Sequence, residues 1–122
     1  MEPSFHHFQF VFLNKYEKTY EKGRVVAFSC EGLDEILVKR VAACPGDRAV
    51  ISEGTLFVNG VVSEVFPQKG FFSEEGLLKE EILLGKGQYL VLGDNAEESV
   101  DSRFSEVGVV QEEDILGFVC GT

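Results

Sequence analysis

The chain has 122 residues, of which 44% are hydrophobic, and this is enough apolar material for one hydrophobic core, so we expect a single domain over residues 1–122. Its 21 acidic and 11 basic residues give a formal net charge of −10 with no basic stripe, which argues against nucleic acid as a partner. No apolar run is long enough to span a membrane and the start has no signal-peptide pattern, so we expect the chain as given to be soluble.

Most of the chain alternates apolar and polar residues between turn residues, which predicts a mainly β fold with short antiparallel strands and little helix. A first strand with an aromatic face is expected over residues 8–13. A second strand is expected over 24–29 and a third over 36–42. Pro45 and Gly46 suit the central positions of a type II turn, because proline fixes the first φ and glycine permits the positive second one, so strands are expected on both sides.

The strongest local signal is a hairpin at Asn59-Gly60. This dipeptide separates the apolar segments 56–58 and 61–62. A type I′ turn needs positive φ at both central residues, and asparagine and glycine tolerate it best.

Alternation fails over residues 66–87, which we interpret as a long excursion between strands. Within it, Ser73 is a candidate N-cap for a short amphipathic helix, because two glutamates follow it and acids favour the first helical turn. Alternation returns in a strand over 89–92 and in a final strand over 117–120.

The cysteines and histidines do not form a metal-site pattern. Cys30, Cys44 and Cys120 are odd in number and widely spaced, so we interpret them as small buried apolar residues. His6 and His7 are adjacent, and their side chains would diverge in a strand. We therefore expect no metal and no cofactor.

Lys39 is unusual because it lies within 35–42, a run that otherwise indicates a buried strand. Its face of the strand also carries Leu37 and Val41. A lysine with an ordinary pKa of about 10.4 must lose several pKa units to act as a general base at neutral pH, and desolvation beside aliphatic residues lowers the pKa in that direction. The alternative is a structural lysine whose amine reaches water from the end of its flexible stem.

The segment 93–103 is the second candidate for a site. Asp94 and Asn95 are able to bond nearby backbone amides in a turn, and Asp101 and Arg103 share a side where they can form an ion pair. Such contacts alone are more typical of a scaffold than of a site. Ser99 is the exception, because a hydroxyl close to a buried amine accepts its hydrogen bond and fixes its direction.

Three segments together resemble, in order and spacing, the sequence boxes of type I signal peptidases, which are membrane-bound serine proteases with a Ser-Lys dyad. The segments are Met1-Glu-Pro-Ser-Phe5, Val38-Lys-Arg-Val…Pro45-Gly-Asp47 and Gly93-Asp-Asn…Ser99-x-Asp-Ser-Arg103. The resemblance spans nearly the whole chain. It implies the compact antiparallel β fold of that family and an endopeptidase that removes signal peptides from exported preproteins.

The resemblance also implies roles for single residues. Lys39 matches the catalytic lysine, and Ser99 matches a serine beside it. Asp101 and Arg103 match an ion pair that supports the catalytic residues. We assign Asp94 and Asn95 to the same supporting role, in which they do not contact the substrate. An extended substrate would pair with two backbone segments and meet small apolar pockets lined by Met1, Phe5 and Val38. The backbone segments are Met1, Glu2, Pro3 and Ile36, Leu37, Val38.

The family's nucleophile is a serine directly before the methionine of its opening box, and here Met1 is the first residue. Ser4 aligns as a neighbour of the nucleophile and not as the nucleophile itself. The resemblance therefore implies a catalytic domain without its N-terminal membrane anchor, on the extracytoplasmic face of the plasma membrane. Two alternatives stay open: the nucleophilic serine precedes Met1 in a longer native chain, or the protein is a homologue that cannot cleave a substrate. The chain as given is then expected to be inactive. Two departures from the family are Ala96, where an arginine is frequent, and Arg24, where an acid is common.

Two other functions remain open. One is a noncatalytic relative that uses the same groove to bind peptides or to assist the assembly of surface proteins. The other is an acidic β module with no peptidase ancestry. Lys39 favours the enzyme, because a binding protein has no need of a buried general base.

Overall fold

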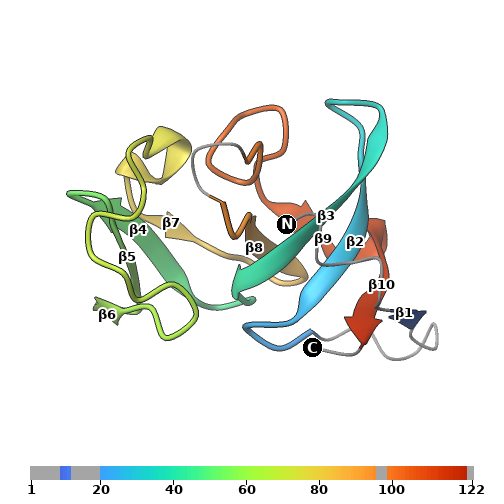
Figure 1. Ribbon diagram of the computed structural model, residues 1–122, viewed down its shortest axis with the longest axis horizontal. Helices are drawn as coiled ribbons and strands as arrows, with labels where there is room; N and C mark the ends of the chain where they lie inside the picture. The colour runs from blue at the N-terminus through green and yellow to red at the C-terminus, as the bar shows by residue number, and fades with distance from the viewer. Residues whose placement is uncertain (1–8, 12–19, 96–98, 121–122) are drawn as a thin grey trace.

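The computed structural model describes residues 9–11, 20–95 and 99–120 and is mainly antiparallel β, which confirms the expected fold class. In these residues it contains a six-stranded sheet of order β1-β10-β2-β3-β8-β9 and a four-stranded sheet of order β6-β5-β4-β7. Figure 1 shows the smaller sheet at the left and the larger sheet at the centre and right. The strands are β1 Gln9–Val11, β2 Val25–Cys30, β3 Glu35–Ala43, β4 Arg48–Ser52, β5 Thr55–Val58, β6 Val61–Val62, β7 Ile82–Leu83, β8 Gln88–Leu92, β9 Val110–Gln111 and β10 Ile115–Cys120. Two short 3-10 helices are η1 Gly76–Lys79 and η2 Glu112–Asp114.

The predicted second, third, 89–92 and final strands are confirmed as β2, β3, β8 and β10. β1 covers only the middle of the expected first strand, and residues 8, 12 and 13 lie outside the described residues. The Pro45-Gly46 turn is also confirmed, with Gly46 at φ +90° and the Asp47 N–H donating to the Cys44 carbonyl at 3.0 Å. The strand that follows it is β4. β9 and η2 were not predicted, because each is too short to leave a periodic pattern.

The Asn59-Gly60 hairpin is confirmed. Val58 pairs with Val61 across the turn, and Asn59 and Gly60 have φ of 56° and 84°, as a type I′ turn requires. The Asn59 side chain also accepts a hydrogen bond from the Arg48 N–H at 2.9 Å, which ties the turn to β4.

The prediction of an amphipathic helix capped by Ser73 is wrong. The segment contains only η1, whose N-terminal cap is Glu75 without a side-chain capping hydrogen bond. Gly76 has a φ of +56°, outside the right-handed helical region, and Ile82 lies in β7. The helix signal is therefore overridden by contacts that this segment makes elsewhere in the fold.

β3 and β8 lie between two hydrophobic cores. Alternate residues of β8 face each core, with Leu90 and Leu92 in one and Tyr89 and Val91 in the other. In β3 only the residues from Val41 to Ala43 are buried, whereas Glu35 and Ile36 are exposed. The expectation of a buried strand over 35–42 is therefore wrong for its first half, and Lys39 lies where β3 leaves the cores.

The two described cysteine side chains are free thiols. Cys30 is buried and Cys44 is partly buried, and the side chain of Cys120 lies outside the description. His6 and His7 also lie outside it. Residues 20–95 and 99–119 present no cluster of His, Cys, Asp or Glu side chains suited to a metal ion. No helix in the described part of the chain has the length and apolar character needed to cross a membrane.

Candidate active site

Lys39 occupies the point where β3 passes from the protein interior to the surface. It pairs with Val26 of β2, whereas β8 pairs with β3 only from Arg40 to Ala43. The partial burial of the Lys39 amine lowers its pKa, because desolvation penalises the ammonium form, and the Arg103 charge lowers it further. The negative charges of Asp101 and Asp94 act in the opposite direction and do not reverse the shift. Lys39 therefore loses its proton at a lower pH than an exposed lysine does.

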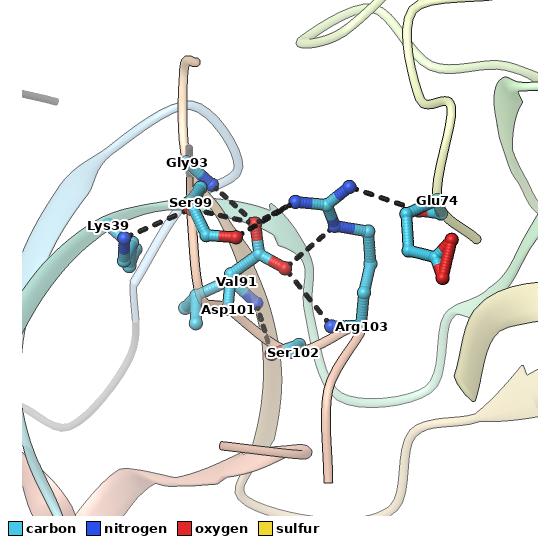
Figure 2. A network of polar contacts seen from close by, with 8 residues as sticks. All are labelled: Lys39, Glu74, Val91, Gly93, Ser99, Asp101, Ser102 and Arg103. Atoms are coloured by element: carbon cyan, nitrogen blue, oxygen red, sulfur yellow. Dashed lines mark hydrogen bonds and ion pairs between the residues drawn. The ribbon is translucent and has the colours of Figure 1, made fainter. Parts of the chain in front are cut away.

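Lys39 and Ser99 are brought together by the fold although they are far apart in sequence. The Lys39 Nζ donates to the Ser99 Oγ at 3.0 Å, and the Ser99 Oγ donates to the Asp101 Oδ2 at 2.9 Å (Figure 2). Because a hydroxyl has one proton, Ser99 accepts from Lys39 while it donates to Asp101. A neutral amine that directs an N–H at Ser99 keeps its lone pair for a different proton donor.

Asp101 and Arg103 form a fully buried ion pair. The Arg103 Nε donates to the Asp101 Oδ1 at 2.8 Å and its Nη2 donates to the Oδ2 at 3.1 Å, and both side chains are 0% exposed. The Arg103 guanidinium also lies 5.2 Å from the centre of the Phe72 ring. A two-point pair in an apolar setting has a fixed geometry, so the Asp101 carboxylate is held in one orientation.

Backbone contacts from β8 fix the loop that carries these side chains. The Ser102 N–H donates to the Val91 carbonyl and the Ser102 Oγ accepts from the Val91 N–H, both at 3.0 Å. The Gly93 N–H donates to the Asp101 Oδ2 at 3.0 Å. Ser99, Asp101 and Arg103 are therefore anchored to the strand that pairs with β3.

Gly93 has a steric role that the sequence did not reveal. A Cβ at this position would overlap the Ser99 Oγ and lie 3.6 Å from the Lys39 Nζ. The absence of a side chain is thus what allows the Ser99 hydroxyl to approach the amine. Glycine could be recognised as a turn residue from sequence, but not as the residue that leaves this space.

Asp94 contacts an arginine that the sequence alone did not connect with it. The part of its own turn over residues 96–98 lies outside the described residues, so the expected bonds to the amides there stay a prediction. The Asp94 carboxylate accepts from the Arg40 Nε and Nη2, both at 2.9 Å, and the Arg40 Nη1 donates to the Gly23 carbonyl at 2.8 Å. Arg40 was missed as a contributor, since no local pattern pairs residues 54 positions apart. Asn95 is exposed, and Ala96 lies outside the described residues.

One edge of β3 is open beside Lys39. β2 pairs with β3 along one side from Glu35 to Arg40, whereas the other side of 35–39 has no strand partner among the described residues. Ile36 is 62% exposed, and Leu37 and Val38 are partly buried. An unpaired strand edge is a template for an extended peptide. The other expected substrate-binding residues, Met1, Glu2, Pro3 and Phe5, lie outside the described residues, as does Ser4.

Comparison with known proteins connects this geometry to one family. The model of the family described as signal peptidase, peptidase S26, matches residues 1–120. Signal peptidase IB of Staphylococcus aureus is 35% identical over 114 residues, a match that covers 81% of this chain and 58% of that protein. Signal peptidase I of Bacillus amyloliquefaciens is 30% identical over 127 residues, covering 96% of this chain and 67% of that protein. The chain therefore spans little more than half the length of the Staphylococcus relatives.

The fold has a counterpart among solved structures. A crystal structure of a signal peptidase I from Enterococcus faecalis V583 superposes with a TM-score of 0.66 at 24% sequence identity. The match covers 84% of this chain and 97% of that chain. The two-sheet architecture is thus shared over most of the described residues.

Proposed function

The chain belongs to the peptidase S26 family of signal peptidases, and from this premise we propose that it is the catalytic domain of a serine endopeptidase that removes signal peptides from exported preproteins. The observation that carries the proposal is the partly buried Lys39 amine, with its lowered pKa and its hydrogen bond to Ser99. By the same family argument, the domain is held on the extracytoplasmic face of the plasma membrane by an anchor that precedes residue 1.

Lys39 acts in this proposal as the general base of a Ser-Lys dyad. The family places its nucleophilic serine directly before the residue that matches Met1, and we assign the same serine to this protein. Its hydroxyl proton passes to the lone pair of neutral Lys39 while its oxygen attacks the scissile carbonyl carbon. The Lys39 ammonium then protonates the leaving amine, which leaves an ester between the serine and the substrate. Water gives a proton to Lys39 as it attacks the ester carbonyl, and Lys39 returns this proton to the serine oxygen when the ester bond breaks and the acid product leaves.

Ser99 and the residues behind it orient the base. Ser99 receives one N–H of Lys39, so the amine lone pair is directed away from Ser99 and is available to the nucleophile. Asp101 and Arg103 fix the Ser99 hydroxyl in turn. Arg40 and Asp94 hold the loop that carries Gly93 against β3.

The open edge of β3 supplies the substrate groove. A signal peptide in extended form would add as a strand beside Ile36 to Val38, which places its scissile bond near Lys39. Val38, together with Met1 and Phe5, would line small apolar pockets. Such pockets suit short side chains such as alanine at the cleavage site.

The test adds one serine and a few upstream residues before Met1 and assays cleavage of a signal-peptide substrate with an Ala-x-Ala site in detergent. We expect cleavage that is abolished by Lys39→Ala and retained in Lys86→Ala, a control that removes an exposed lysine. Residues 1–122 alone are expected to show little or no turnover. Cleavage that survives Lys39→Ala would contradict the dyad.

The second candidate function is a noncatalytic peptide-binding factor. The open β3 edge supports it, because strand addition by a peptide needs backbone groups and no general base. Binding of the Ala-x-Ala peptide without cleavage, after the serine is restored, would favour this function over the peptidase.

A further inference from the structure

A single turn of chain lies behind Arg103, on the side away from Asp101. The Arg103 Nη1 donates to the Glu74 carbonyl at 3.0 Å, and the Leu77 N–H donates to the Arg103 carbonyl at 2.7 Å. Figure 2 shows the guanidinium between the Asp101 carboxylate and Glu74. The turn 74–77 therefore contacts both the side chain and the backbone of Arg103.

Gly76 makes this approach possible. Its φ of +56° lies in the left-handed region, and a Cβ at this position would overlap the Arg103 carbonyl oxygen. The overlap is with backbone, which cannot rotate away as a flexible side chain would. An alanine at this position must displace either the turn or Arg103.

The turn is itself held by the four-stranded sheet. The Glu75 carboxylate accepts from the Gly54 N–H at 3.1 Å in the connection between β4 and β5, and the Gly54 carbonyl accepts from the Phe72 N–H at 2.9 Å. Leu78, the next residue after the turn, is fully buried in the core that this sheet covers. The position of the turn is thus set by a part of the fold that does not contact Lys39.

We propose that the turn 74–77 is a positioning element for the Lys39–Ser99 pair, and that Gly76 is its key positioning residue. The turn holds Arg103 against Asp101, Asp101 holds the Ser99 hydroxyl, and Ser99 directs the Lys39 amine. The four-stranded sheet then supports the site at a distance. This inference rests on the proposed function, in which Lys39 is the base.

The charges around Lys39 determine in which direction its pKa should change when the turn is perturbed. The charged groups that act on the amine are Asp101 and Asp94, which favour the ammonium, and Arg103, which disfavours it. If Arg103 moves away from Asp101, the positive charge recedes and the carboxylate is left uncompensated. Both changes stabilise the ammonium, so the pKa of Lys39 rises toward its ordinary value.

The experiment compares Gly76→Ala with Gly70→Ala and measures the pKa of Lys39 by NMR on residues 1–122 with labelled lysine side chains, assigned with Lys39→Ala. Gly70 is a matched control because its φ is +67° and a Cβ there meets no atom within 4 Å. We expect the Lys39 pKa to rise in Gly76→Ala and to stay unchanged in Gly70→Ala. A folded Gly76→Ala with unaltered Lys39 titration would overturn the inference, as would an equal rise in Gly70→Ala.

A second variant covers the case in which Gly76→Ala does not fold. Glu75→Ala removes the hydrogen bond to Gly54 without inserting an atom near Arg103. We expect a smaller rise of the same sign, and no rise in a folded Glu75→Ala would reject the positioning role. The titration needs no turnover, so its failure is separate from failure of the cleavage test with Lys39→Ala.

Discussion

Two aspartates of one loop each form a two-point pair with an arginine. Replacing each aspartate with asparagine measures how much burial adds to the contribution of such a pair to the free energy of unfolding. Asp101 and Arg103 are 0% exposed, whereas the Asp94 and Arg40 side chains are 41% and 27% exposed. The Asp101 Oδ1 accepts from the backbone N–H and the Nε of Arg103, so an amide nitrogen in its place would face two donors. The Oδ2 accepts from the Gly93 N–H, the Ser99 Oγ and the Arg103 Nη2, so an amide nitrogen there would face three donors. Asp101→Asn thus removes a negative charge beside a buried guanidinium and sets donor against donor.

We expect Asp101→Asn to lower the free energy of unfolding by about 3 to 5 kcal/mol, because one partner of a buried pair is removed. Asp94→Asn, the matched control, is expected to cost about 1 kcal/mol or less, because water replaces the lost partner. The assay is urea unfolding followed by circular dichroism and tyrosine fluorescence, since the chain has three tyrosines and no tryptophan. The midpoints are compared at constant m-value. Equal losses in the two variants would refute the argument that burial sets the energetic weight of the Asp101–Arg103 pair.

Three further predictions concern the dyad. Gly93→Ala should displace the Ser99 hydroxyl and lower the free energy of unfolding by about 1 to 3 kcal/mol. A crystal structure of the variant would check for loss of the Lys39–Ser99 contact, and an unmoved hydroxyl would contradict the steric role of Gly93. Ser99→Ala should reduce cleavage by the serine-restored protein by about 10²-fold, which is less than the loss in Lys39→Ala, because the base remains but loses the acceptor that orients it. Equal losses in the two variants would mean that Ser99 does more than orient the Lys39 amine. The pH profile of kcat/KM should rise as Lys39 loses its proton, with its acid limb below the ordinary lysine pKa, since burial lowers that pKa and only the neutral amine accepts a proton; a limb at the ordinary value would argue against Lys39 as the base.

What was predictable from sequence was mostly local. The Asn59-Gly60 turn and the Asp101–Arg103 pair each depend on residues one or two positions apart, where backbone geometry decides the contact. The Lys39–Ser99 contact joins residues 60 positions apart, and only a family resemblance brought them together in advance. The Asp94–Arg40 pair has the same long range, and composition or periodicity carries no trace of it.

The failures have physical causes. Ser73 followed by two glutamates is a sound helix signal, but in the fold Glu75 bonds the Gly54 amide and the turn bonds Arg103, so tertiary contacts override the local preference. Glu74 contributes through its backbone carbonyl, which every residue type has. Such a contribution leaves no signature in the side-chain sequence.

The passage of β3 from core to surface divides one strand into two regimes of tolerance to mutation. Ala42 and Ala43 are fully enclosed, so a larger side chain there would strain the packing against the second sheet. Ile36, three residues before Lys39, lies mostly in solvent, and substitutions there cost the fold little. If a peptide binds beside Ile36 as the proposed function holds, a homologue can alter this residue while the lysine keeps its place, and substrate preference can then diverge without loss of the scaffold.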